Sequence, residues 1–404
     1  GTMQIQGLSW YPGHMTKTKR MIVAEMGHMD AVCEILDARI PLSSRNPDVD
    51  EMTALLRCFG CDASFEGDSL VICADGIDNL ISPYELVTKF RASFLVSGIS
   101  LPGGCRIGTR PVDLHIKGLC LMGAQSQMGH GFMEFRAKRL HGAKIYLDFP
   151  SVGATENLMT AACLAEGVTE IENAATEPEV TDLANFLIKC GAHIDGAGTE
   201  HITVNGVDGL RACEYSIIPD RIEAGTFMVA AACTGGNVSI TGALSEHLNP
   251  IIAKLREMGV TVEEKQEVIT VAKSGTIKAT DIKTLPHPGF PTDMQSVFSA
   301  LMCYAEGTGI ITETVFENRF MHMTELMRMH ANIKIDGRSA VIEGCSSLDG
   351  AMVTATDLRA GAALAIAGMA ALGTTRIESA ELICRGYENF DRKLRSLGAD
   401  IEFR

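Results

Sequence analysis

The stretch LIKCGAHIDG (residues 187–196) contains the pattern from which the fold can be predicted. Leu187 lies at the end of an amphipathic segment, Gly191 suits the left-handed cap of a helix, and HIDG continues as a short strand. The same leucine-to-glycine step recurs at Leu56/Gly60, Leu119/Gly123, Leu255/Gly259 and Leu394/Gly398, and at Leu326/His330 with the glycine replaced. The leucines are nearly evenly spaced along the chain. It is therefore predicted to repeat one unit of about 68 residues six times.

A second helix precedes this step in each unit. Counting from Ser151, Asp220 and Asp357, a glycine stands at +16 and an isoleucine at +20; the copy from Asp293 is slightly shorter. The segments between these marks are rich in alanine, as in AGAALAIAGMAALG, and suit helices that pack closely in a core. A single unit of helix, strand, helix and strand cannot bury its own sheet. We therefore expect an α/β (α+β) fold in which units share a core in two groups of three.

The expected boundaries follow from this grouping. The boundary between the two groups falls near Pro219 and Asp220, and the sequence pattern of residues 1–52 differs from that of the rest of the chain. We predict three parts: 1–52, mainly helical, with a helix over residues 15–32; 53–219, the first repeat domain; and 220–404, the second.

Composition restricts the possible functions. The chain has 404 residues, 46% of them hydrophobic, and a formal net charge of -15. That charge opposes non-specific binding to nucleic acid or to an anionic membrane. The longest apolar run, residues 360–372, is too short to span a bilayer, and no signal-peptide pattern is expected. Thirteen scattered cysteines suit a reducing compartment, so a cytoplasmic protein is expected.

The stretch LPGGCRIGTRPVDLHIKGL (residues 101–119) concentrates unusual chemistry. Cys105 follows two glycines and is flanked by Arg106 and Arg110, whose positive charge would stabilise a thiolate. The glycines permit a mobile loop over a site. An ordinary surface turn with a free cysteine remains an equal alternative on this local pattern alone.

Charged residues recur at the starts of the predicted helices. The first helix of a unit begins at an aspartate in three copies, at Asp220, Asp293 and Asp357. Just before or within the second helix of a unit lie Arg110, Glu177, Arg319 and Arg385. Helix N-termini bind anions, and arginines gathered there would form a phosphate and carboxylate site. For a single aspartate, N-capping is the alternative; for Arg91, Arg110 or Arg385 it is a surface salt bridge.

Several longer motifs together resemble one family. They are LPGGCRIGTRPVDLH, SVGATEN at 151–157, ENAATEPE at 172–179, PDRIEAGTF at 219–227, HPGFPTDMQ at 287–295, TETVFENRFMH at 312–322, ATDLRA at 355–360 and RGYE at 385–388. Residues 53–404 resemble the UDP-N-acetylglucosamine enolpyruvyl transferases. The resemblance implies two inside-out α/β domains, with the first repeat incomplete.

The resemblance also implies a reaction and its residues. An enolpyruvyl group would pass from phosphoenolpyruvate to the 3-hydroxyl of UDP-N-acetylglucosamine, releasing phosphate, as the first committed step of peptidoglycan synthesis. Cys105 would protonate the methylene carbon, Asp293 would accept the hydroxyl proton, and Arg385 would complete the catalytic set. The implied substrate contacts are Arg91, Arg110, Pro111, Val112, Asp113, Leu114, His115, Ser151, Val152, Gly153, Glu177, Asp220, Val315, Arg319, Asp357 and Arg359. No metal or organic cofactor is required, and a cytoplasmic monomer is expected.

Two features depart from the family pattern. Residues 10–50 resemble the start of ribosome biogenesis GTPase A, although no G-x-x-x-x-G-K-[ST] motif occurs, and they replace a family strand and Lys-Asn pair. When Arg91 is aligned with Arg359, Ile99 comes earlier than the isoleucine expected at +20, the position of Ile377 in its copy. The helix before Cys105 should therefore be shortened and leave a gap in the core. Three functions remain open: a transferase whose activity is impaired or lost; an inactive nucleotide-sugar-binding homologue; and a ribosome-associated fusion protein.

Overall fold

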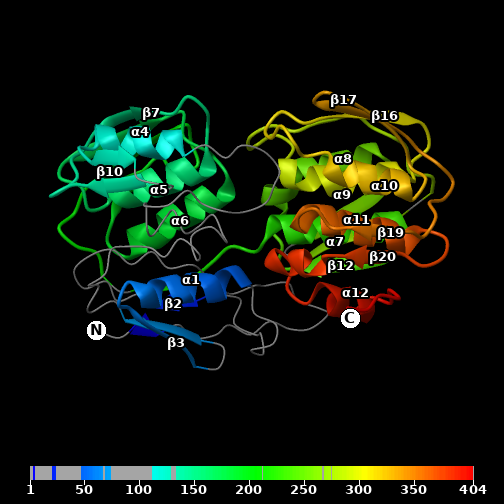
Figure 1. Cartoon of the computed structure of the whole chain (residues 1–404), viewed down its shortest axis with the longest axis horizontal. Helices are drawn as coiled ribbons and strands as arrows, with labels where there is room; N and C mark the ends of the chain where they lie inside the picture. The colour runs from blue at the N-terminus through cyan, green and yellow to red at the C-terminus, as the bar shows by residue number, and fades with distance from the viewer. Residues whose placement is uncertain are drawn as a thin grey trace. The chain divides into compact units, whose positions relative to one another are not determined.

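The chain divides into two compact units. The computed structural model describes residues 3–4, 21–23, 47–66, 69–73, 112–128, 133–211, 213–265, 268–273 and 275–403. Within these residues the first unit extends to Ile218, and the second begins at Pro219 (Figure 1). The three-part division at residues 52 and 219 remains a prediction, and helix α1 (Pro47–Cys58) crosses the first of those boundaries.

The first unit combines short strands with four described helices. The helices are α1, α4 (Asp113–Leu121), α5 (Val152–Ala162) and α6 (Pro178–Lys189). The strands are β1 (Met3–Gln4), β2 (Met21–Val23), β3 (Asp62–Glu66), β4 (Ser69–Cys73), β5 (Gln125–Met128), β6 (Met133–Arg136), β7 (Lys144–Tyr146), β8 (Val168–Glu172), β9 (His193–Asp195), β10 (His201–Asn205) and β11 (Glu214–Ser216).

The second unit has the same kinds of element. Its helices are α7 (Arg221–Thr234), α8 (Asn249–Glu257), α9 (Gln295–Met302), α10 (Met321–Arg328), α11 (Leu358–Ala370) and α12 (Phe390–Ser396), with 3-10 turns η2 (Ser245–Leu248), η3 (Thr292–Met294) and η4 (Ala380–Arg385). Its strands are β12 (Asn237–Thr241), β13 (Val260–Lys265), β14 (Val268–Lys273), β15 (Ile282–Lys283), β16 (Thr308–Thr312), β17 (Asn332–Asp336), β18 (Ser339–Glu343), β19 (Met352–Thr354) and β20 (Arg376–Glu378).

The predicted repetition is confirmed by the sheets. In the first unit the strand order is β7-β8-β10-β9, with β7 parallel to β8 and the other pairs antiparallel. The second unit contains the order β15-β16-β18-β17 with the same directions. Each strand of the second sheet therefore corresponds to a strand of the first sheet, two repeats earlier in the chain. The sheet β12-β14-β13 contains the antiparallel part of the same pattern.

The leucine-to-glycine step ends a helix in every copy. Gly60, Gly123, Gly191, Gly259 and Gly398 all have positive φ, between 87° and 106°. His330, which replaces the glycine in the remaining copy, also has a positive φ, of 67°. A left-handed residue at this point lets the chain leave the helix and enter the next segment. The spacing in the sequence therefore marks a real backbone requirement.

Helices occupy the interior of the second unit, and its sheets lie outside them. Helices α7, α9 and α11 pack against one another (Figure 1). All eight residues of α9 are buried, as are residues 360–367 of α11. Strand β16 turns only alternate residues inward. Small alanine side chains let the helix backbones approach closely, which accounts for the alanine-rich composition.

Two secondary-structure predictions are wrong. We expected a helix over residues 15–32, but Met21–Val23 form β2, which pairs antiparallel with β11. The ladder satisfies the backbone groups that a helix would have paired internally. The repeat also predicts a strand at DIEF (residues 400–403) after Gly398, as at HIDG after Gly191, but residues 400–403 form no strand and pair with none of the described strands. The shortened helix expected before Cys105 lies outside the described residues.

The glycine after the third strand of each four-stranded sheet is predicted to be essential for stability. A Cβ atom at Gly206 would lie 1.6 Å from the carbonyl oxygen of Ala165, and the equivalent Gly344 has the same clash with Ala305. Replacing Gly206 with Ala should lower the free energy of unfolding by about 3 kcal/mol, because backbone atoms must move to accept the Cβ atom. Urea unfolding followed by circular dichroism measures this loss. Gly209→Ala is the matched control, since no atom lies within 4 Å of its Cβ position; an equal loss in both variants would contradict the steric argument.

Candidate active site

The second unit brings one carboxylate and two arginines together from three segments distant in sequence. Asp293 lies in η3, directly before the buried helix α9. Arg319 precedes α10, and Arg359 lies in the first turn of α11. Because α9 and α11 pack against each other and α10 contacts both, the starts of these helices meet at one place. The repeated fold thus gathers the starts of helices from successive repeats.

The three side chains form a fixed ionic cluster. Arg319 Nη2 lies 2.7 Å from Asp293 Oδ1, and Arg359 Nη2 lies 3.3 Å from Asp293 Oδ2. Arg359 Nε donates to the same Oδ2 at 3.3 Å. The arginine side chains are 4% and 12% exposed, whereas the Asp293 side chain is 37% exposed. The carboxylate is therefore the member of the cluster that solvent or a ligand can reach.

The electrostatics keep Asp293 ionised. The partial burial of Asp293 would by itself raise the pKa of its carboxyl group, but the charges of Arg319 and Arg359, together with that of Arg221, hold the pKa well below its usual range. Burial also disfavours the charged form of Arg359 and by itself would lower its pKa. Tyr387, Asp293 and Asp220 outweigh this effect and raise the pKa of Arg359 overall. Arg359 also lies over the Tyr387 ring, with its guanidinium carbon 5.0 Å from the centroid.

Two of the predicted aspartates cap helices. Asp220 Oδ1 accepts hydrogen bonds from the backbone N–H groups of Ile222 and Glu223 at the start of α7. Asp357 Oδ1 accepts from the N–H groups of Arg359 and Ala360 at the start of α11. Capping was the alternative to a binding role, and the structure shows the caps. The Asp357 cap also fixes the backbone from which Arg359 projects.

The other predicted residues of the second unit lie near this cluster in the fold or in sequence. Val315 N donates to the carboxylate of Glu313, close to Arg319 in the chain. Arg385 is the last residue of η4, which packs against α11, and Tyr387 follows it closely in the chain. Their roles toward a substrate remain predictions.

In the first unit, the described candidates also gather at helix N-termini. Val112 is the N-cap of α4, and Asp113, Leu114 and His115 form its first turn. Ser151 caps α5 by accepting from Ala154 N at 3.3 Å, and Val152 and Gly153 follow it. Glu177 is the N-cap residue of α6. Such ends offer free N–H groups to the anionic part of a ligand. Arg91, Cys105, Arg110 and Pro111 lie outside the described residues.

The sequence interpretation gave no role to several residues that lie around this cluster. Glu313 is 1% exposed and accepts hydrogen bonds from four groups, among them Thr292, the neighbour of Asp293. Tyr387 stacks on Arg359, and its hydroxyl lies 3.0 Å from Thr226 Oγ1. Glu313, Thr292 and Tyr387 all occur within motifs that carried the family resemblance, and this was the only signal in the sequence that could have identified them.

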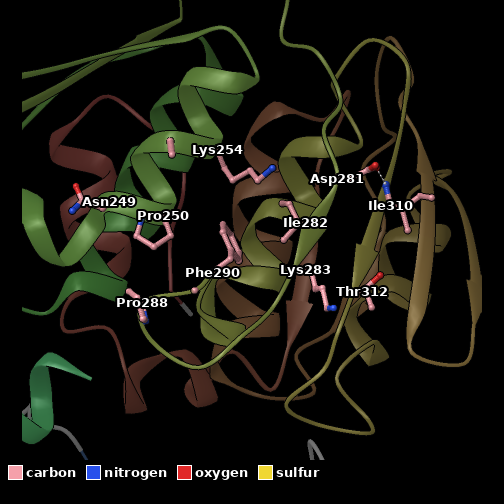
Figure 2. A pocket seen from close by; sticks show the side chains of 12 residues that line it. Asn249, Pro250, Lys254, Asp281, Ile282, Lys283, Pro288, Phe290, Ile310 and Thr312 are labelled. Carbon is pink, nitrogen blue, oxygen red and sulfur yellow. Dashed lines mark hydrogen bonds between the residues drawn. The ribbon is translucent and has the colours of Figure 1, made fainter. Parts of the chain in front are cut away.

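A separate cavity of about 710 Å³ lies beside α8 and the parallel strands β15 and β16. Figure 2 shows Phe290 in its lining, between Pro250 and Pro288 on one side and Ile310 and Thr312 on the other. Asp293 and the two arginines are not among its lining residues. Of its two lysines, Lys283 is exposed and Lys254 is paired with Glu257. No buried, unpartnered polar side chain among the described lining residues defines a ligand there.

Buried His322 should make the protein sensitive to acid. Burial, and then the charge of Arg319, lower its pKa from 6.5 to about 3, and Ser299 Oγ lies 3.1 Å from its Nε2. Between pH 6.5 and 3 the unfolded chain binds a proton that the folded chain does not, so stability is lost as pH falls. Between about pH 7.5 and pH 5, the free energy of unfolding of the His322→Gln variant should fall by about 2 kcal/mol less than that of the wild type. Parallel urea titrations of both proteins measure it; identical losses would contradict a neutral buried imidazole.

Comparison with known proteins identifies the class of protein to which this fold belongs. The sequence model of the EPSP synthase (3-phosphoshikimate 1-carboxyvinyltransferase) family matches residues 38–394. Among solved structures, the enolpyruvyl transferase NikO from Streptomyces tendae is similar, with a TM-score of 0.80, 23% identity and coverage of 99% of this chain and 98% of that one. An EPSP synthase from Acinetobacter baumannii gives a TM-score of 0.69 at 20% identity, with both chains covered completely. The chain therefore has the enolpyruvyl transferase fold.

Curated relatives narrow the class to one family. A UDP-N-acetylglucosamine 1-carboxyvinyltransferase 1 from Caldanaerobacter subterraneus is 56% identical over 364 residues, covering 88% of each chain. A UDP-N-acetylglucosamine 1-carboxyvinyltransferase 2 from Carboxydothermus hydrogenoformans is 54% identical over 367 residues, again covering 88% of each. The chain belongs to the UDP-N-acetylglucosamine 1-carboxyvinyltransferase family, as its motifs predicted.

Proposed function

We propose that this protein transfers the enolpyruvyl group of phosphoenolpyruvate to the 3-hydroxyl of UDP-N-acetylglucosamine and releases phosphate, the first committed step of peptidoglycan synthesis. The observation that carries the proposal is the position of Asp293 between Arg319 and Arg359 in a member of this family. A partly exposed carboxylate supplies a base, and the guanidinium groups supply positive charge for an anionic substrate.

The charge of the cluster suits phosphoenolpyruvate. Its phosphate and carboxylate together carry about three negative charges at neutral pH. Arg319 Nε and Arg359 Nη1 are buried donors without a hydrogen-bond partner among the described residues, and a substrate anion that enters beside Asp293 would satisfy them. Transfer by addition and elimination passes through a tetrahedral intermediate that keeps both anionic groups. Cations fixed in advance stabilise that intermediate without reorganisation.

Asp293 becomes a stronger base when this substrate arrives. In the present arrangement the two arginines hold its pKa well below its usual range, which favours the ionised form but makes it a weak proton acceptor. An incoming phosphate competes for the same guanidinium groups and adds negative charge nearby. Both effects raise the pKa of Asp293 towards the value needed to accept the sugar hydroxyl proton.

The remaining roles follow the family resemblance. Cys105 delivers a proton to the methylene carbon, and Arg110 and Arg385 hold the phosphate and carboxylate. Pro111 to His115, Ser151 to Gly153, Arg91 and Val315 contact the nucleotide sugar. The N-terminus of α5, where Ser151 is the cap, offers N–H groups suited to the diphosphate.

Phosphate release in the presence of both substrates tests the proposal. The intact chain should release phosphate from phosphoenolpyruvate only when UDP-N-acetylglucosamine is present, and Cys105→Ala should slow the release. Equal rates in the two proteins would remove the role of Cys105. Calorimetric binding of UDP-N-acetylglucosamine without any phosphate release would instead indicate a nucleotide-sugar-binding protein without catalysis.

The expected setting is a cytoplasmic monomer that binds neither nucleic acid nor membrane. The acidic net charge of -15 supports this. None of the helices in the described part of the chain is long and apolar enough to cross a bilayer. Gel filtration with light scattering checks the oligomeric state.

A further inference from the structure

Glu313 is a buried carboxylate that no substrate contact explains. It follows β16 directly and is 1% exposed. Its Oε1 accepts hydrogen bonds from Thr284 Oγ1 at 2.8 Å, Val315 N at 2.8 Å and Phe316 N at 3.2 Å. Its Oε2 accepts from Thr292 Oγ1 at 2.8 Å. A buried carboxylate is costly unless it is hydrogen-bonded, and here four donors satisfy it.

The directions of these hydrogen bonds are fixed by their neighbours. Backbone N–H groups can only donate. Thr284 Oγ1 accepts from Thr314 N at 2.9 Å, so its own hydrogen points to Glu313. Thr292 Oγ1 accepts from Arg319 Nη1 at 3.0 Å, and a guanidinium can only donate. The Thr292 hydrogen is therefore left for Glu313, and the carboxylate accepts from every partner.

A directed chain of hydrogen bonds thus runs from Arg319 through Thr292 to Glu313. The other end nitrogen of Arg319, Nη2, pairs with Asp293, the residue after Thr292. Arg319 is held by two successive residues of η3, one through the charge of Asp293 and one through the hydroxyl of Thr292. Of these two contacts, only the one with Thr292 can persist when a substrate anion draws Arg319 away from Asp293; the Arg319 guanidinium also lies over the Phe316 ring, 5.2 Å from the centroid.

We infer that Glu313 is a positioning residue, which through Thr292 keeps Arg319 in place while phosphoenolpyruvate displaces its ion pair with Asp293. The inference rests on the proposed function. Glu313 also fixes the turn at Val315 and Phe316 through its Oε1, independently of Thr292. Loss of the Thr292 hydroxyl should therefore affect the phosphoenolpyruvate side of the site and leave the Val315 turn intact.

Thr292→Val and Thr292→Ser form the matched pair for a test. Valine keeps the branched shape but has no hydroxyl, whereas serine keeps the hydroxyl. Loss of a hydrogen bond to a charged group changes an equilibrium constant by about 10- to 100-fold. Thr292→Val should therefore weaken phosphoenolpyruvate binding by about 10- to 100-fold and lower kcat. Thr292→Ser should remain within about threefold of wild type, and the Kd of UDP-N-acetylglucosamine should change little in either variant.

A double-mutant cycle tests the link to Glu313. If Thr292 and Glu313 act as one chain, Glu313→Gln should cost little further phosphoenolpyruvate affinity in the Thr292→Val protein. Calorimetry measures the affinity separately from turnover, and melting temperatures confirm folding. Equal affinities in the valine and serine variants, or additive losses in the cycle, would overturn the inference. If the wild type binds phosphoenolpyruvate and the valine variant does so more weakly, but neither transfers it, the proposed function fails and the positioning role stands. No binding to the wild type would end both.

Discussion

Asp293→Asn is expected to lower kcat for enolpyruvyl transfer by about 10²- to 10⁴-fold, the usual contribution of a general base. The amide keeps the shape of the side chain, so the fold should be retained. The affinity for phosphoenolpyruvate should stay the same or increase, because the negative charge that now pairs with Arg319 and Arg359 is removed. Steady-state rates and calorimetric titration give the two values.

The opposite directions of these two effects make the prediction specific. Damage to the fold would weaken binding and turnover together. Asp336→Asn serves as the control, because Asp336 ends the outer strand β17 and is exposed. If Asp293→Asn retained its turnover, Asp293 would not be the base.

Arg359→Lys is expected to lower kcat/KM for phosphoenolpyruvate by about 100-fold. Arg359 directs Nε and Nη2 at one oxygen of Asp293 and stacks on the ring of Tyr387. Lysine keeps the charge but has neither the planar fork nor the flat stacking surface. Disrupting a buried charged pair costs about 2–5 kcal/mol or more, which allows an effect of this size.

The control for Arg359→Lys is Arg376→Lys, because Arg376 lies exposed on β20. This control should remain within about twofold of wild type in kcat/KM, as expected for a surface substitution. Equal losses in the two variants would show that the planar geometry of Arg359 makes no special contribution.

The repeated fold could be predicted from the sequence because its marks are local. A leucine, a left-handed residue shortly after it and a short strand involve few neighbouring residues, and even His330 could be recognised as the replaced glycine. The positions of Asp293, Arg319 and Arg359 at helix starts followed from the same spacing. Their mutual contact depended on the assumption that helices of different repeats share a core.

Features that depend on distant pairing could not be predicted in this way. Strand β2 (Met21–Val23) is very short, and its partner β11 (Glu214–Ser216) lies at the far end of the first unit's sequence. No local period distinguishes β2 from a helix. Glu313 obtains its role only where the segments of Thr284, Thr292 and Val315 meet. A glutamate after a strand otherwise resembles an ordinary surface residue.

The most direct test of enolpyruvyl transfer is the reaction in D2O followed by proton NMR. Protonation of the methylene carbon and later loss of a proton should leave deuterium in the methylene group of the product. We expect one enolpyruvyl ether of UDP-N-acetylglucosamine for each phosphate released, with deuterium in that group. Phosphate released while UDP-N-acetylglucosamine stays unchanged, or a product with no deuterium, would contradict transfer by addition and elimination at this site.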